Sequence, residues 1–240
     1  MRKRITAVLL FCVTASVTAK DVEVTPTCTG ATCQQAFESI TEDLVALIDY
    51  KALGPAEATG LTGIGVGVVG SYVPVDVEGD WQQVTGQNFS GLALVGLQVT
   101  KGLPLDLDLG AFYTTVPGTN VDVYGAEMRY AFLAGSATTP ALSLRGSYVT
   151  VTGIDSFDLD SKSVELALSK GFGPITPYVS AGYVWGSADP DASTGLTEAK
   201  VEETKAVLGV RFSLGLFEFT PQVGQVGDVV TYALRLGFSI

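Results

Sequence analysis

The sequence predicts an all-β protein, a closed antiparallel transmembrane β-barrel of about ten strands that follows an N-terminal amphipathic helix. From Leu61 onward, apolar residues alternate with small or polar ones, as in strands whose two faces meet different surroundings. Charged residues make up 16% of the chain, against roughly 25% in soluble domains. Beyond the first residues no segment has the long apolar run of a spanning helix, and closed barrels are the other fold that satisfies its backbone in lipid.

Residues 1–19 have the features of a secretory signal peptide. The basic start MRKR precedes a short apolar run, and Val17 and Ala19 are the small residues expected before cleavage after Ala19. The run is far shorter than the roughly 20 residues of a membrane anchor, and Phe11 before Cys12 does not fit a lipoprotein signal. The net charge of -11 argues against a nucleic-acid partner.

The mature chain keeps two cysteines, Cys28 and Cys33, within the sequence CTGATC. In an oxidising periplasm two such close neighbours are expected to form a small disulfide loop. A metal site would need further soft ligands nearby, and the chain has no histidine. We therefore predict a disulfide, no metal site and no cofactor.

Residues 34–53 are the one segment with a clear helical pattern. The apolar stripe at helical spacing consists of Phe37, Ile40, Leu44, Leu47 and Ile48, and Gly54-Pro55 follows the helix. The favoured interpretation is a periplasmic helix packed beneath the barrel, within an N-terminal periplasmic segment 20–60, because an apolar stripe suits a packed surface better than a wet lumen. The alternative is a plug inside the lumen, with its acidic residues against lumen arginines.

Residues 61–240 are predicted to form the barrel. The expected strands are 61–75, 91–101, 105–113, 121–134, 141–152, 161–170, 175–185, 201–213, 217–223 and 229–240. An even number of strands returns the C-terminus to the side where the first strand starts, which we assign to the periplasm. The short connections then face the periplasm. The longer polar ones after Val75, Ile154 and Trp185 face outside, where their acidic residues are expected to be solvated rather than bound to divalent cations.

The apolar face is predicted to contact lipid. It is too bulky in total to fill the inside of a small barrel, and the other face is rich in Gly, Ser and Ala and poor in Lys, unlike a soluble surface. The aromatic residues also separate into two levels, as in the interface girdles of membrane barrels. The outer girdle is predicted to contain Tyr113, Tyr124, Tyr148, Tyr183 and Trp185, and the inner girdle Phe132, Phe212, Phe217 and Phe238.

The last strand, 229–240, alternates strictly and carries Arg235 on its polar face. It resembles the closing strand of small bacterial outer-membrane β-barrel proteins of the OmpA/OmpW-like superfamily, and the resemblance covers about 61–240. Such proteins usually end on Phe or Trp, whereas here Phe238 stands two residues before the terminal Ile240. The resemblance implies an outer-membrane location, with lipid and lipopolysaccharide around the barrel and the barrel-insertion machinery as a partner during biogenesis. The oligomeric state stays open.

Charged residues of both signs are predicted to line the lumen. They are Asp106, Asp108, Glu127, Arg129, Arg145, Glu165, Lys205, Arg211, Glu218 and Arg235. These side chains can pair into a packed network, which we favour in so narrow a barrel, or they can line a pore. The expected function is a narrow pore or transporter for small solutes. The alternative is a non-conducting structural or surface-binding protein that acts through its outer loops.

An enzyme is not expected. The known lipid-hydrolysing and acyl-transferring barrels of the outer membrane use a His beside a Ser, and this chain has no histidine. Asp106 and Asp108 have a spacing that places both on one face of a strand, but the same spacing is simply that of lumen residues. No catalytic residue is therefore predicted.

Overall fold

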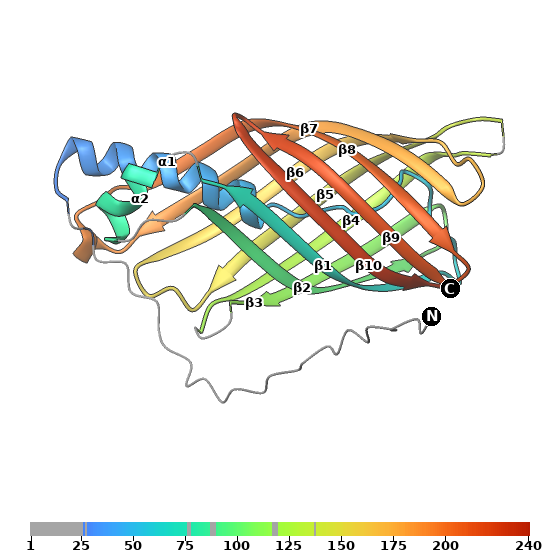
Figure 1. Cartoon of the computed structure of the whole chain (residues 1–240), viewed down its shortest axis with the longest axis horizontal. Coiled ribbons are helices and arrows are strands. Elements are labelled where there is room, and N and C mark those ends of the chain that lie inside the picture. Colours follow the sequence, from blue (N-terminus) through green and yellow to red (C-terminus); the bar gives the residue numbers. More distant parts are fainter. Residues whose placement is uncertain (1–25, 27, 76–77, 87–89, 117–119, 137) are drawn as a thin grey trace, which may run out of the picture.

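Ten antiparallel strands close into a barrel in the computed structural model, which describes residues 26, 28–75, 78–86, 90–116, 120–136 and 138–240 (Figure 1). The predicted signal peptide, 1–19, lies outside the described residues. Each strand pairs with its neighbours in sequence, and β1 pairs with β10 to complete the ring. The predicted fold class and strand number are confirmed.

The strand bounds follow the alternating pattern closely. The strands are β1 (Ile64–Pro74), β2 (Gly91–Gly102), β3 (Leu107–Thr115), β4 (Asp122–Ala134), β5 (Ala141–Thr152), β6 (Phe157–Ser169), β7 (Ile175–Pro190), β8 (Ala199–Leu214), β9 (Phe217–Val226) and β10 (Val229–Ser239). A short 3₁₀ turn, η1 (Ala192–Thr194), lies between β7 and β8.

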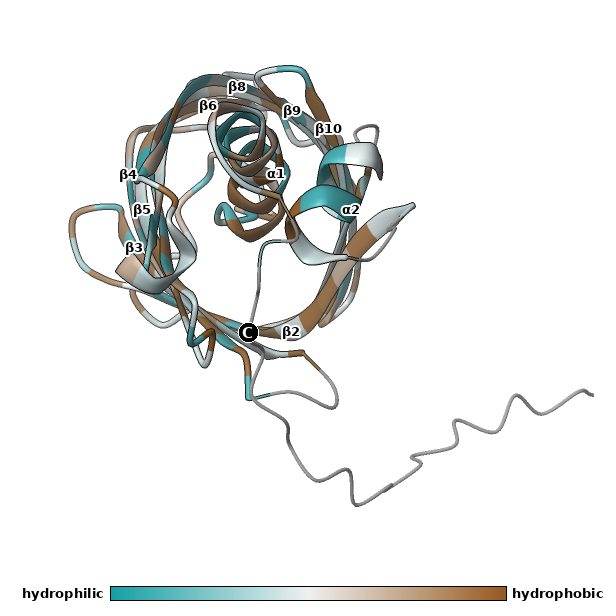
Figure 2. Cartoon of the chain, turned by 90° about the vertical axis from the view of Figure 1, so that its left-hand side faces the viewer, coloured by the Kyte–Doolittle hydropathy of each residue, from teal (hydrophilic) through white to brown (hydrophobic). Residues whose placement is uncertain are grey.

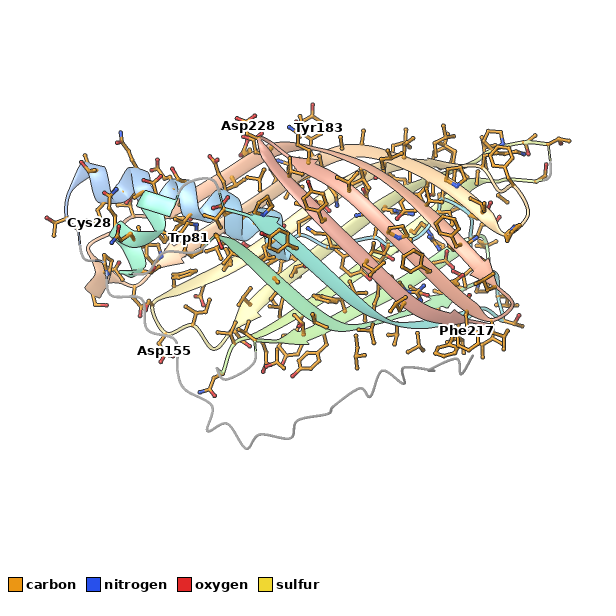
Figure 3. All side chains as sticks on the ribbon, viewed as in Figure 1. Cys28, Trp81, Asp155, Tyr183, Phe217 and Asp228 are labelled. Carbon is orange, nitrogen blue, oxygen red and sulfur yellow. A yellow bond between two sulfur atoms is a disulfide. The ribbon has the colours of Figure 1, made fainter. Side chains whose placement is uncertain are left out.

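The two ends of the barrel differ in their connections. One end, which we call the turn end, carries connections 103–106, 135–140, 170–174 and 215–216 together with the C-terminal Ile240. The opposite end, the loop end, carries connections 75–90, 116–121, 153–156, 191–198 and 227–228. Figure 3 places Cys28, Trp81 and Asp155 at the loop end and Phe217 at the turn end.

Helix α1 (Ala31–Ile48) lies inside the ring of strands at the loop end (Figure 2), and the short helix α2 (Glu78–Thr85) packs beside it. The predicted helix is present, but it ends earlier than 53. Lys51 folds back there and its Nζ donates to the carbonyl oxygens of Ala46 (2.6 Å) and Asp49 (3.0 Å), which satisfies two backbone acceptors where the helix stops. Neither described helix has the length and apolar character needed to cross a membrane.

Strands β6, β7 and β8 extend further toward the loop end than the sequence pattern predicted. The residues Asp158, Asp160 and Asp189 were expected in loops because they are charged, but they alternate with inward apolar residues such as Leu159 and Ala188. Those inward residues belong to the same apolar cluster as α1. The strands are therefore extended where their inner face packs against α1.

The outer surface is apolar along the middle of every strand. Large side chains such as Val95, Leu97, Leu208 and Leu236 are about half exposed on this surface, while the residues between them point inward. The tyrosines and the tryptophan of the predicted outer girdle lie on the same surface toward the loop end, and the phenylalanines of the inner girdle lie toward the turn end. Aromatic neighbours contact each other at both levels: Tyr183 stacks on Trp185 with 6.1 Å between ring centroids, and Phe217 and Phe238 lie tilted at 4.5 Å.

Candidate functional site in the barrel lumen

The loop-end half of the lumen is filled by apolar contacts with α1. Phe37, Ile40, Val45 and Ile48 of the helix are buried in one cluster with inward residues of the wall. The wall residues in that cluster include Val73, Val123, Val149, Leu159, Val184, Ala188 and Val201. Since apolar side chains pack against apolar wall on the inside, this half of the lumen holds a protein core rather than a water-filled channel.

The wall is shaped to receive the helix. Gly186 of β7 points inward, and a Cβ atom at this position would come within 2.4 Å of a methyl carbon of Val45. Only glycine leaves room there for the helix to approach the strand so closely. At the outer rim Gln34 is fixed to the 191–198 connection, because its side chain donates to the Thr197 carbonyl (3.1 Å) and accepts from the Thr197 amide (2.9 Å).

The helix ends on a buried ion cluster. Lys205 of β8 is 2.8 Å from Oδ2 of Asp49 and 3.7 Å from Oε2 of Glu165, and it donates to the Tyr50 carbonyl (3.2 Å). Lys51 adds a second cation 3.9 Å from Asp49. The Lys205 and Asp49 side chains are 4% and 1% exposed, so their charges are compensated by one another and by Glu165 and Lys51 rather than by water.

Below this cluster, wall arginines hold the chain by its backbone. Arg145 donates to the carbonyl oxygens of Ala52 (3.3 Å), Gly54 (2.5 Å) and Pro55 (2.8 Å) and lies 3.5 Å from Glu165. The guanidinium presents several donors in a fixed plane, which suits a run of carbonyls that have no strand or helix partner. The irregular segment that follows α1 is thereby fixed to the wall.

A second arginine repeats this arrangement nearer the turn end. Arg129 pairs with Asp108 through two hydrogen bonds, 2.9 and 2.5 Å, and also donates to the Pro55 carbonyl (2.7 Å) and to Oγ1 of Thr59 (3.1 Å). Asp108 in turn accepts from the Thr59 amide at 3.1 Å. Both Arg129 donors converge on Oδ2 of Asp108, so the pair fixes the orientation of the guanidinium as well as compensating its charge.

The charged cluster nearest the turn end also includes a residue from the lumen segment. Glu57 is 3.2 Å from Arg211, which is 3.6 Å from Glu218. Glu218 accepts from Arg235 at 2.8 Å. The four side chains alternate in sign, so each cation has an acidic neighbour.

These charged residues surround a polar cavity of about 330 Å³ that extends to the turn end. Its lining includes Arg145 and Glu127 at the inner side and Ser213, Gly215 and Ser239 near the rim. Glu127 is 8% exposed, and its Oε2 has no hydrogen-bond partner among the described residues. We call this space the vestibule; it lies on the turn-end side of the part of the lumen that α1 occupies.

The structure places most of the predicted lumen residues inside the barrel. Asp108, Glu127, Arg129, Arg145, Glu165, Lys205, Arg211, Glu218 and Arg235 all face inward. Asp106 does not: it lies exposed in the 103–106 turn with a positive φ of 56°, because β3 begins only at Leu107. The turn ends the alternation that had assigned this residue to the lumen.

The residues that sequence reasoning missed belong to the segment after the helix. Asp49, Lys51 and Glu57 provide lumen charges that pair with the wall. The wall strands did contain a signal that the N-terminal segment lies in the lumen. Near the loop end the inward positions change from Gly and Ser to residues such as Val149 and Val184, which indicates that something apolar fills that part of the lumen.

The expected position of the helix also needs revision. Helix α1 lies at the loop end, whereas Ile240 and the start of β1 lie at the turn end. A barrel that spans a membrane places these ends on opposite sides. A periplasmic helix and a periplasmic C-terminus therefore do not occur together in this fold, and the alternative of a helix inside the lumen is the one that the structure contains. The predicted disulfide between Cys28 and Cys33 is confirmed.

The outer surface determines the surroundings of the barrel. Its apolar belt between two aromatic levels, on a closed ring with charges inside, is the arrangement that a lipid bilayer requires of a β protein. The protein is an outer-membrane β-barrel. It associates with outer-membrane lipid along this belt, and lipopolysaccharide and the insertion machinery remain expectations.

No protein-family model matches the sequence, and no curated protein matches it. Among solved structures, Ail of Yersinia pestis is 14% identical, covering 74% of this chain and 97% of its own, with a TM-score of 0.31. OprG of Pseudomonas aeruginosa is 14% identical, covering 78% and 99%, with a TM-score of 0.30. OmpTdeltaL8 is a loop L8 deletion mutant of OmpT, an outer membrane protein of Vibrio cholerae. It is 13% identical with a TM-score of 0.34, and the match covers 62% of this chain and 54% of that one.

Identities and TM-scores this low carry no weight for function. The assignment of the barrel to the outer membrane rests on its own closed ring and outer surface.

The docking of α1 is expected to depend on pH through Glu42. Partial burial raises the pKa of Glu42, and the carboxylates of Glu203, Asp43, Asp228 and Glu38 raise the pKa further. A raised pKa in the docked state means that protonation of Glu42 favours docking. This contribution is complete below the ordinary pKa of 4.5 and is lost as the pH rises through the raised value.

We therefore expect hydrogen exchange at α1 amides to slow as the pH is lowered toward 4.5, after correction for the intrinsic exchange rate. In Glu42→Gln this dependence should weaken, because the titrating group is gone. Glu202→Gln, on the exposed outer face of β8, is the matched control and should behave as the unchanged protein. Equal pH dependence in Glu42→Gln and the unchanged protein would contradict the assignment.

Proposed function

We propose that the protein is a sealed outer-membrane barrel that does not conduct solutes at rest and acts at the membrane surface through its loop end. The apolar packing of α1 against the inner wall is the observation that carries this proposal. A solute entering from the turn end reaches the vestibule and then meets the ion cluster of Asp49 and Lys205, with the helix behind it. Passage would require the buried apolar face of α1 to leave the wall.

Conductance in planar lipid bilayers tests the seal. The unchanged protein should be silent, and a variant without residues 20–60 should show discrete openings. Strand content by circular dichroism and heat-dependent migration on gels would establish that the shortened barrel is folded. Openings in the unchanged protein would refute the sealed state, and a folded but silent shortened barrel would refute the sealing role of the N-terminal segment.

A point variant supplies the same test without a deletion. Gly186→Leu places a side chain where Val45 of α1 lies, so it should displace the helix and open the barrel. Gly70→Leu is the matched control, because Gly70 faces outward and nothing lies within 4 Å of an added Cβ. Gly186→Leu should conduct, and Gly70→Leu should remain silent.

The second candidate is a gated narrow pore or transporter for small solutes. The vestibule favours it, since a polar cavity of about 330 Å³ lined by charges of both signs offers an entry site for a small polar solute. In this case the unchanged protein would open under conditions that release α1. That the protein is not an enzyme remains a prediction.

A further inference from the structure

The N-terminal segment runs through the barrel from one end to the other. After α1, Asp49 and Tyr50 contact Lys205. The carbonyl oxygens of Ala52, Gly54 and Pro55 then accept hydrogen bonds from Arg145. Beyond these contacts Thr59 binds Asp108, and the chain emerges at the turn end to enter β1 at Ile64. Every step of this path is held by wall residues, so the segment is a fixed part of the fold.

The start of α1 and the residues just before it are fixed at the loop end. The Cys28–Cys33 disulfide closes a loop around the start of the helix, and Gln34 is bound to Thr197 in the 191–198 connection. Residues such as Thr29, Gly30 and Gln35 are exposed there. We call residues 28–35 the head. The head therefore lies at the loop-end side of the barrel.

Two features indicate which side that is. The connections at the turn end are short and include the C-terminus, as at the periplasmic end of bacterial barrels. At the loop end, β6 to β8 continue beyond the lipid with charged outward residues such as Asp158, Lys200 and Glu202, and in bacterial barrels the longer extensions are the extracellular ones. The loop end is thereby assigned to the cell exterior.

We propose that the barrel holds its N-terminal segment, from α1 to Thr59, in its lumen and displays the head on the outside of the cell. This inference rests on the proposed function, in which the sealed barrel acts through its loop end, and it identifies the head as the part of the loop end that is presented. The lumen binds the chain's own segment: Arg145 of the wall donates to the backbone carbonyl oxygens of Ala52, Gly54 and Pro55, a kind of group that any extended peptide offers. The head is then the surface available to a partner outside the cell.

Antibody staining of intact cells tests the display. One epitope is inserted between Lys20 and Asp21, a second in the 191–198 connection and a third between Gly215 and Leu216 at the turn end. In intact cells the first two should stain and the third should not, while all three should stain after the outer membrane is permeabilised. Staining of the N-terminal epitope only after permeabilisation, with the loop epitope accessible in intact cells, would overturn the proposal.

A measurement on the unchanged protein covers the case in which an insertion prevents folding. Intact cells are treated with an amine-reactive reagent coupled to a polymer too large to enter the periplasm, and the modified lysines are identified by mass spectrometry. Lys20 and Lys200 should react and Lys170 at the turn end should not. Protection of Lys20 together with reaction of Lys200 would overturn the display. Bilayer silence is compatible with either result, so failure of this proposal is distinct from failure of the seal.

Discussion

Replacement of Lys205 by methionine is expected to release α1 from the lumen. Lys205 lies 2.8 Å from Asp49 and 3.7 Å from Glu165, and all three side chains are almost fully buried. Removal of one partner from such a cluster leaves uncompensated charge in a dry interior, at a cost of about 3–5 kcal/mol. The free energy of α1 undocking should fall by an amount of this order, as measured by hydrogen exchange of α1 amides, and conductance should appear.

The double variant Lys205→Met with Asp49→Asn separates charge from packing. It removes one charge of each sign, so the undocking free energy should recover part of the loss. Lys200→Met, a surface lysine whose side chain is 66% exposed, should leave α1 exchange unchanged. Two results would rule out the buried ion pair as the cause. One is an equal loss of undocking free energy in Lys200→Met, and the other is an undocking free energy that is lower in the double variant than in Lys205→Met alone.

Phe37→Ala is expected to weaken the same docking by a different mechanism. Phe37 is 1% exposed in the apolar cluster and meets Phe157 of β6 edge to face, with 5.9 Å between ring centroids. Loss of a buried phenylalanine side chain costs about 3–5 kcal/mol, through lost burial and the cavity that remains. Amides of α1 should exchange faster, while those of β10 should keep their protection because the ring of strands is intact.

Phe217→Ala is the matched control for this variant. Phe217 is a turn-end residue whose side chain is exposed on the outer surface beside Phe238, at 4.5 Å between ring centroids. Its truncation should leave α1 exchange unchanged, since its surroundings are lipid and not the lumen. If α1 amides exchanged no faster in Phe37→Ala than in Phe217→Ala, the helix would not be held by its apolar face.

The barrel itself was predictable because alternation is a local property. In β10, Tyr232, Leu234 and Leu236 point one way and Ala233 and Arg235 the other, and this order is visible in the sequence without knowledge of any partner strand. The same alternation identified the two levels of aromatic residues. Strand limits were less certain at the loop end, where charged outward residues looked like loops.

The path of the N-terminal segment could not be predicted in the same way. The apolar stripe of α1 shows that Phe37 and Ile40 must be buried, but a stripe does not identify the surface that buries it. That surface is assembled from residues such as Val73 and Val184 on strands far apart in the sequence. Partners such as Lys205 for Asp49 depend on the irregular backbone after the helix, which has no periodicity.

The closure of the ring has a consequence for the order of assembly. The seam between β1 and β10 runs from the pair Gly65–Ser239 to the pair Tyr72–Tyr232, and Ile64 and Ile240 add two backbone hydrogen bonds, of 2.9 and 3.0 Å. It is therefore complete only when the whole of β10 is paired. Until then β1 and β10 are free strand edges, and we expect their long-range pairing to form slowly and to compete with pairing to a wrong strand. Helix α1 precedes all ten strands in the sequence, but the pairing of β1 with β10 is the step that encloses it. We therefore expect α1 to enter the lumen before β1 pairs with β10. A barrel in which β1 and β10 are joined before that step should lack the helix in its lumen.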